Sequence, residues 1–406
     1  MTDKTCVPPR STLTLDTIKG DLEIGQHALV KGTTAQAKVK VYGTVYCKGH
    51  DTFECNLSAE NLEAENSVTV HGDLEIEDSV EVEDGSLEVY GSMTAKDIDV
   101  DDSVYVSKDL TADEIEVGGS LKVEGNVKIE DIEIGGTFES KGEVTAENIE
   151  VGGSIAIKSK ADIKNLEVGG TAEVTGGNIR EIDVGGTFES DGPLEFGSID
   201  VGGTVRLSGK SKGEKVEVGG SFAVKGDLEF EEIEVGGTVE ITGLAQGHDM
   251  EVGGKVDIDG SLRLTGTLEV GGRVDVSGEI ATKNIEVGGM LRARKAAAEE
   301  GVEVGGSITT GEGITARSLE IGRRGEVHGL IKAEEVIINR EAHVEDVYGK
   351  DIVLRSGAEA NNIYGQNVTI ESHCSVRGEV QYTGELKLGE RVALSKQPQK
   401  VANLPV

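Results

Sequence analysis

Apolar residues recur along most of the chain as pairs separated by one polar residue, which is the two-residue period of a β-strand. One unit, written from Ile115, reads I-E-V-G-G-S-L-K-V-E-G-N-V-K-I-E-D. It contains three such pairs, and turn-compatible residues such as Gly118 and Gly119 lie between them. Long i, i+3, i+4 patterns are missing, although residues 292–300 could form a helical turn or a bulged corner. The pattern predicts three short strands and three corners per unit.

The Gly-Gly pair repeats twelve times in step, at intervals of 16, 17 or 18 residues. The first glycines of these pairs are Gly118, Gly135, Gly152, Gly169, Gly185, Gly202, Gly219, Gly236, Gly253, Gly271, Gly288 and Gly305. A period this constant indicates that one structural unit is stacked on itself many times. We therefore predict an all-β fold, a single-stranded triangular parallel β-solenoid.

Matching apolar pairs extend this repeat in both directions, from Ile24 to Leu388, and predict about 22 coils of 16–18 residues. The one large irregularity lies between Val41 and Ala64, where we expect an insertion near residues 51–56. The predicted organisation is one elongated domain with short tails. Its segments are a disordered tail at 1–12, N-terminal coils at 13–60, a regular solenoid at 61–325, C-terminal coils at 326–388, and a tail or cap at 389–406.

Composition agrees with a narrow, fully paired fold. Glycine is abundant (58 residues), aromatic residues make up 3%, and four of the five prolines lie in the predicted tails. Proline cannot donate a hydrogen bond to a strand ladder, so this placement fits a paired middle. No apolar run reaches the roughly 18–20 residues of a membrane span, and the first ten residues do not resemble a signal peptide. Four cysteines are too few for a disulfide scaffold, and we expect a cytoplasmic protein.

The formal charge is −35, and part of it is arranged in a column. The outward residue of the first strand is acidic in sixteen consecutive coils. These residues, here called the acidic column, are Glu63, Glu81, Asp99, Glu116, Glu133, Glu150, Glu167, Asp183, Asp200, Glu217, Glu234, Glu251, Glu269, Glu286, Glu303 and Glu320. Stacking places neighbours about 5 Å apart, inside a Debye length of about 8 Å. The column could be a solvated face that keeps the protein soluble, an adaptation to a salty cytoplasm, or a surface for cations or a basic partner.

The column then stops, because its next positions are Ile337, Val353, Thr369 and Lys387. The same face becomes apolar and slightly basic there. This change predicts a different contact surface, on which the C-terminal coils dock the chain's own tail or another subunit.

No motif indicates catalysis, a cofactor or a metal. Cys47, His50 and Cys55 lie close together in the sequence, and Cys6 could fold back onto them, but zinc sites usually show tighter paired spacing. His373 and Cys374 are adjacent and should point to opposite faces of a strand. No phosphate-binding loop occurs, and the negative charge disfavours nucleic acid. We expect no catalytic, cofactor-binding or metal-binding residues and no nucleic-acid partner.

The segment 319–388 resembles the bactofilins, a family of polymer-forming cytoskeletal proteins. The resemblance is carried by L-E-I-G-R-R-G-E-V-H-G-L-I-K-A-E-E-V-I-I and by A-H-V-E-D-V-Y-G-K-D-I-V-L. It implies a right-handed triangular β-helix that polymerises end to end without nucleotide, with itself and other cytoskeletal or envelope-associated proteins as partners. This chain is several times longer than the usual bactofilin core. Its N-terminus lacks the hydrophobic membrane-targeting stretch of some members, so membrane contact is not implied.

The ends of a solenoid carry open strand edges and an apolar cross-section that must be capped or paired. The candidate assembly residues are Leu13, Leu15, Leu22, Ile24, Ile337, Val353, Leu386, Leu388 and Val392. We therefore expect a self-assembling structural protein. The alternatives are a rod-like spacer that binds partners at residues 326–388 and an enzyme of the hexapeptide-repeat transferase kind.

Overall fold

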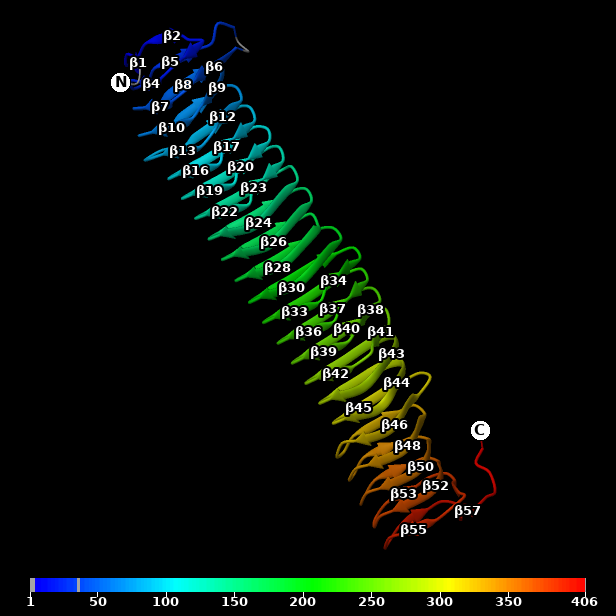
Figure 1. The fold of residues 1–406 in the computed structure, drawn as a ribbon. Helices are drawn as coiled ribbons and strands as arrows, with labels where there is room; N and C mark the ends of the chain where they lie inside the picture. Colours follow the sequence, from blue (N-terminus) through cyan, green and yellow to red (C-terminus); the bar gives the residue numbers. More distant parts are fainter. Residues whose placement is uncertain (1–3, 35–36, 406) are drawn as a thin grey trace. The chain divides into compact units, whose positions relative to one another are not determined.

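The computed structural model describes residues 4–34 and 37–405, and these residues contain β-strands and no helix. The strands pair in parallel as a β-solenoid of about 23 turns, which confirms the predicted fold class (Figure 1). Most turns contain three strands, one on each of three faces, and each strand pairs with its equivalents in the turns before and after it. The chain divides into two compact units, Met1–Gly202 and Gly203–Val406. The boundary falls within the regular repeat, where each turn contacts only its neighbours and no change in sequence marks a border.

In the first unit, most strands are confined to one of the three faces and end before the next corner. The first-face strands are β1 (Lys4–Val7), β4 (Asp21–Ile24), β7 (Thr44–Cys47), β10 (Asn61–Ala64), β13 (Ser79–Val82), β16 (Asp97–Val100), β19 (Glu114–Val117) and β22 (Asp131–Ile134). The second-face strands are β2 (Thr12–Thr14), β5 (Leu29–Lys31), β8 (Asp51–Glu54), β11 (Val68–Val70), β14 (Leu87–Val89), β17 (Ser103–Val106), β20 (Ser120–Val123), β23 (Thr137–Ser140), β25 (Ser154–Ile157), β27 (Thr171–Val174) and β29 (Thr187–Ser190). The third-face strands are β3 (Thr17–Ile18), β6 (Lys38–Val41), β9 (Asn56–Ala59), β12 (Leu74–Ile76), β15 (Met93–Thr94), β18 (Leu110–Thr111) and β21 (Val127–Lys128). Four longer strands run from the third face into the next first face, namely β24 (Val144–Val151), β26 (Ala161–Val168), β28 (Gly177–Val184) and β30 (Leu194–Val201).

The second unit has the same three faces. Its first-face strands are β33 (Lys215–Val218), β36 (Glu232–Val235), β39 (Asp249–Val252), β42 (Thr267–Val270) and β55 (Leu386–Leu388). The second-face strands are β31 (Thr204–Ser208), β34 (Ser221–Lys225), β37 (Thr238–Ile241), β40 (Lys255–Ile258), β45 (Ser307–Thr310), β47 (Glu326–His328), β49 (His343–Val344), β51 (Glu359–Ala360), β53 (Ser375–Val376) and β56 (Ala393–Leu394). The third-face strands are β32 (Ser211–Lys212), β35 (Leu228–Glu229), β38 (Ala245–Gly247), β41 (Leu262–Leu264), β54 (Val380–Tyr382) and β57 (Gln399–Lys400).

Six strands of the second unit turn a corner without a break. Third-to-first-face strands are β46 (Ile314–Ile321), β48 (Ile331–Ile338), β50 (Val347–Leu354) and β52 (Ile363–Ile370), and strands that pass all three faces are β43 (Arg273–Val287) and β44 (Met290–Val304). Residues 292–300, where a helical turn or a bulged corner was predicted, therefore form strand within β44, with register shifts against β43 and β46. Alanine fits this strand because Ala296 and Ala298 are buried in the core.

The core consists of the inward members of the apolar pairs. Ile115, Val117, Leu121 and Val123 are at most 1% exposed, and their equivalents are buried in nearly every turn. The Gly-Gly corners stack so closely that a Cβ on Gly237 would lie 2.2 Å from the carbonyl oxygen of Gly220. Only glycine fits such a corner, because real Cβ atoms do not approach a backbone oxygen that closely.

The N-terminal turns differ from the prediction in two ways. Residues 4–7 of the predicted disordered tail form β1, which pairs with β4, whereas residues 1–3 lie outside the described residues. The predicted insertion at residues 51–56 is instead occupied by β8 and the start of β9, and β4 pairs with β7. The extra residues of this turn lie between β5 and β6. The apolar pair at Val39 and Val41 had suggested a first-face strand, but these residues lie on the third face, against Leu57 and Ala59 of β9.

Candidate assembly surfaces

The acidic column is aligned within each unit. In the first unit Glu63 pairs in register with Glu81, and the ladder continues residue by residue to Asp200. In the second unit the ladder runs from Glu217 to Glu320. Carboxylates that oppose each other on neighbouring strands repel. Accordingly, Asp99 and then Glu133 raise the pKa of the Glu116 carboxyl.

On the same face of the N-terminal turns, Glu23 lies in register with Tyr46, which in turn lies in register with Glu63, the first residue of the acidic column. Glu23 accepts hydrogen bonds from the ammonium groups of Lys4, at 2.6 Å, and Lys48. These bonds lower the pKa of Glu23 to about 2, with Lys4 making the larger contribution. Glu23 is therefore paired with two ammonium groups, whereas Glu116 on the same face of the middle turns lies between two other carboxylates.

At the C-terminal end the column becomes apolar. Glu320 of β46 is followed in register by Ile337, Val353, Thr369 and Lys387. Ile337 and Val353 are partly exposed, whereas their inward neighbours Val336 and Ile352 are 1% exposed. On the third face of the same turns the rings of Tyr348 and Tyr364 stack with their centroids 4.5 Å apart.

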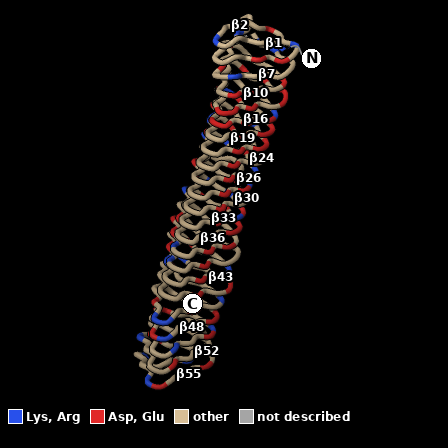
Figure 2. Tube along the Cα trace, turned by 90° about the vertical axis from the view of Figure 1, so that its left-hand side faces the viewer, with Lys and Arg blue, Asp and Glu red and all other residues tan. Residues whose placement is uncertain are grey.

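Net charge and tyrosine are both unevenly distributed along the sequence. Residues 1–60 contain seven acidic and seven basic side chains, and residues 326–406 contain twelve and nine, so 61–325 carries −32 of the −35 charges. Basic residues accordingly appear around β48 and β52 in Figure 2. The seven tyrosines, Tyr42, Tyr46, Tyr90, Tyr105, Tyr348, Tyr364 and Tyr382, all lie before residue 106 or after residue 347. A near-neutral net charge reduces repulsion between two copies at the terminal regions, and tyrosine is enriched at protein interfaces.

The last turn leaves its inward leucines uncovered. Leu386 and Leu388 of β55 pair with Val368 and Ile370 of β52, which are both 1% exposed. Leu386 is half-buried and Leu388 is 49% exposed, because no further turn among residues 4–34 and 37–405 covers them. Val392, the remaining C-terminal candidate, is also only partly buried. Leu388 is thus a large apolar side chain left exposed on a strand whose second edge has no partner strand among the described residues.

The first turn exposes a similar but smaller surface. Leu13 and Leu15 are partly buried, as expected for end residues. Leu22 and Ile24 are 0% exposed, because β1 covers them, and so these two predicted assembly residues are not available at the surface. The sequence missed β1 because Lys4–Val7 contains only one inward apolar residue, Val7.

The residues considered for metal or thiol chemistry do not form a site. Among residues 4–34 and 37–405, no three His, Cys, Asp or Glu side chains could hold one metal ion. Cys47 and Cys55 are buried, and burial raises the pKa of both thiols, that of Cys55 to about 11. Cys374 is buried while His373 is exposed, so the two point in opposite directions.

Sequence reasoning also missed Asp51, a buried carboxylate. Its oxygens accept hydrogen bonds from the backbone N–H groups of Ala28 (2.9 Å) and Gly49 (3.3 Å). Burial raises the pKa of Asp51, and these hydrogen bonds oppose the rise. Asp51 therefore fastens a corner of the N-terminal turns. Its position in the predicted insertion concealed this role.

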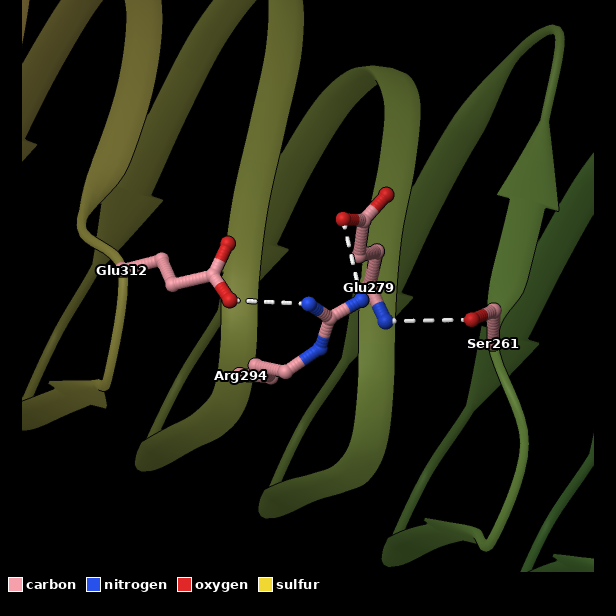
Figure 3. Close-up of polar contacts among 4 residues, drawn as sticks. All are labelled: Ser261, Glu279, Arg294 and Glu312. Atoms are coloured by element: carbon pink, nitrogen blue, oxygen red, sulfur yellow. Dashed lines mark hydrogen bonds and ion pairs between the residues drawn. The ribbon is translucent and has the colours of Figure 1, made fainter.

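In the second unit, ion pairs and hydrogen bonds between side chains also link the corners of successive turns. The guanidinium of Arg294 lies between Glu279 and Glu312, at 3.0 and 2.8 Å, and thereby joins three successive turns (Figure 3). The backbone N–H of Glu279 donates to Ser261 Oγ at 3.1 Å, which extends the ladder by one turn.

Comparisons with family models, with curated proteins and with solved structures give no match to this chain. No helix in the described part of the chain is long and apolar enough to cross a membrane.

Proposed function

We propose that this protein is a structural scaffold that assembles with itself through the ends of its β-solenoid, without a nucleotide. The observation that carries the proposal is the uncovered last turn, where Leu388 is 49% exposed beside a free strand edge. The near-neutral terminal regions support it, because two copies can meet there without the repulsion of residues 61–325. The resemblance of residues 319–388 to bactofilins supports the same function.

Negative-stain electron microscopy over a concentration series tests this function. We expect filaments or end-to-end oligomers that lengthen with protein concentration. Leu388→Arg should shift the population to single chains, because it places a charge in the contact. Met290→Arg is the matched control, since Met290 is 39% exposed but lies on β44, away from the last turn. Single chains at every concentration and salt tested would refute self-assembly, and compact trimers would favour a transferase-like enzyme.

A second candidate function is a spacer that binds a partner through its C-terminal turns. Ile337 and Val353, partly exposed where the column elsewhere carries carboxylates, favour it. Ile337→Glu combined with Val353→Glu restores the acidic column. If these substitutions leave the filaments unchanged, this face is not part of the self-assembly contact and stays available for a different partner.

A further inference from the structure

The turn formed by β44 has a smaller core than the turn before it. Three of its inward residues, Ala293, Ala296 and Ala298, are buried alanines. They continue columns of larger side chains, since Val276 and Ile280 of β43 pair in register with Ala293 and Ala296. The turn of β44 therefore buries less apolar surface than that of β43, and the hydrophobic contribution to its stability is smaller.

Two buried hydroxyl groups beside this turn have no hydrogen-bond partner among the described residues. They are Thr282 Oγ1 on β43 and Thr310 Oγ1 on β45, and each residue pairs in register with one of the three alanines. The two threonines are only 4% and 6% exposed. By contrast, the buried hydroxyl of Ser190 in the first unit donates to the carbonyl oxygen of Gly192 at 2.9 Å. Because a buried hydroxyl without a partner lowers stability, the contacts on both sides of β44 are weakened.

The strand ladder is also interrupted at this turn. The pairing of β43 with β44 contains two register shifts, and the pairing of β44 with β46 contains one, between Ala297 and Gly301. The strands β24 and β26, which also turn a corner without a break, pair without such a shift. At a shift the regular pairing of backbone N–H and C=O groups is disrupted. The backbone therefore holds the corners of β44 less firmly than those of β26.

Ion pairs on the surface lie at the same corners. The guanidinium of Arg294 joins Glu279 and Glu312, and Lys283 Nζ lies 3.6 Å from Glu300 Oε1 (Figure 3 shows the Arg294 pairs). These five side chains are about half exposed, so salt screens their attraction. The part of the second unit with the weakest core is thus closed from outside by contacts that depend on ionic strength.

We propose that the turn of β44 is a salt-responsive site of local opening. Its strand separates from β43 and β46 at a lower free energy than the regular turns of the second unit require, and the ion pairs of Arg294 and Lys283 keep it closed. Such an opening stays local, because each turn of a solenoid contacts only its neighbours. The inference does not depend on self-assembly, since it concerns contacts within one chain.

Hydrogen–deuterium exchange of the full chain, read by mass spectrometry, tests the proposal. The amides of β44 should exchange at least about tenfold faster than those of β36 and β39, whose buried residues include no alanine. The ratio of the two rates should rise about two- to fivefold between about 0.01 M and about 1 M NaCl, because salt weakens the ion pairs at β44. Exchange in β44 no faster than in β36 and β39 would overturn the proposal.

A first pair of variants tests the ion pairs. Arg294→Ala combined with Lys283→Ala should raise the exchange rate of β44 at low salt and remove the response of the rate ratio to salt. Arg292→Ala is the control, since Arg292 is exposed on the same strand and lies outside these ion pairs. A salt response that survives the double substitution would overturn the role of the ion pairs.

A second pair of variants tests the core. Thr282→Val combined with Thr310→Val removes both unpartnered hydroxyls with little change of shape, and should slow the exchange of β44 at low and at high salt. Thr315→Val is the control, because it makes the same change at a partly exposed residue of the next turn. Exchange that is unchanged by the double substitution, or accelerated, would overturn the role of the buried hydroxyls.

Discussion

Two regions of the second unit share one backbone and differ at the surface. The turns from β33 to β46 carry the acidic column, and those from β48 to β55 replace it with Ile337, Val353, Thr369 and Lys387. The inward residues are equally buried in both regions, for example Ile285 at 0% and Ile352 at 1%. The core therefore specifies the solenoid, and the outward positions can change from carboxylates to apolar and basic residues without changing the fold.

The largest expected effect on stability comes from shortening an inward residue, and its outward neighbour serves as the comparison. Ile352→Ala and Ile285→Ala should each lower the free energy of unfolding by about 2–5 kcal/mol, because each leaves a cavity in the core. Val353→Ala should cost less than about 1 kcal/mol, since Val353 points outward. Urea denaturation followed by circular dichroism measures these values. A loss for Val353→Ala as large as that for Ile352→Ala would show that this face packs against something within the chain.

The next largest effect on stability is expected from alanine substitutions at the Gly-Gly corners. Gly254→Ala should destabilise the protein by about 1–3 kcal/mol, because the new Cβ would lie 2.4 Å from the carbonyl oxygen of Gly237. Gly311→Ala is the control, since the nearest atom there is 3.6 Å away. Thermal unfolding of the two variants compares them directly. Equal melting temperatures would mean that the Gly-Gly corners can spread, and that their glycines are not required by close stacking.

The corners of the C-terminal turns do not use a Gly-Gly pair. After the first-face strand they use a residue in the left-handed region, with φ of 62° at Glu341 and 65° at His373. His373→Gly should therefore raise the free energy of unfolding by up to about 1 kcal/mol, because glycine adopts this conformation without strain. A decrease in the urea midpoint would show instead that the His373 side chain makes a stabilising contact.

The fold class could be predicted from the sequence, but several features of the N-terminal turns could not. The apolar pairs and the Gly-Gly period identified the fold class, the acidic column and the core, because the two-residue period and the 17-residue spacing are local. The pairing of β4 with β7 could not be found, since Val39 and Val41 match the template as well as Val45 and Cys47 do. Asp51 and β1 escaped because their burial depends on the neighbouring turns rather than on their own sequence.

The first face also offers a comparison of opposite signs, between Glu116 of the acidic column and Glu23 of the N-terminal turns. Glu116→Gln should stabilise the protein at pH 7 by about 0.2–1 kcal/mol, because it removes repulsion by Asp99 and Glu133. Glu23→Gln should destabilise it, because Lys4 and Lys48 lose their partner.

The pH dependence of the two effects differs as well. Since the pKa of Glu116 is raised in the folded state, the native protein binds this proton more tightly than the unfolded chain does. The destabilisation caused by the charged Glu116 carboxylate therefore disappears as the pH falls toward that pKa. The pKa of Glu23 is lowered to about 2, so its contribution is complete above the pKa of about 4.3 in the unfolded chain and is lost as the pH falls toward 2. Urea midpoints measured from pH 7 to pH 3 should show both trends. The same sign for the two variants at pH 7 would contradict the view that pairing decides how a carboxylate on the first face affects stability.

The smallest effect is expected at Arg294, which has opposite charges on both sides where the column has like ones. Arg294→Ala should lower the free energy of unfolding by less than about 1 kcal/mol, because Arg294, Glu279 and Glu312 are about half exposed and water screens their attraction. Arg292→Ala is the control, since Arg292 is an exposed residue of the same strand with no ion pair to Glu279 or Glu312. Added salt should abolish the difference in the free energy of unfolding between the two variants. By contrast, it should stabilise the turns that carry the acidic column, because it screens the repulsion between their carboxylates. If the effect of Arg294→Ala persisted in about 1 M salt, the packing of its side chain on the corner of β44, rather than its charge, would be what joins these three turns.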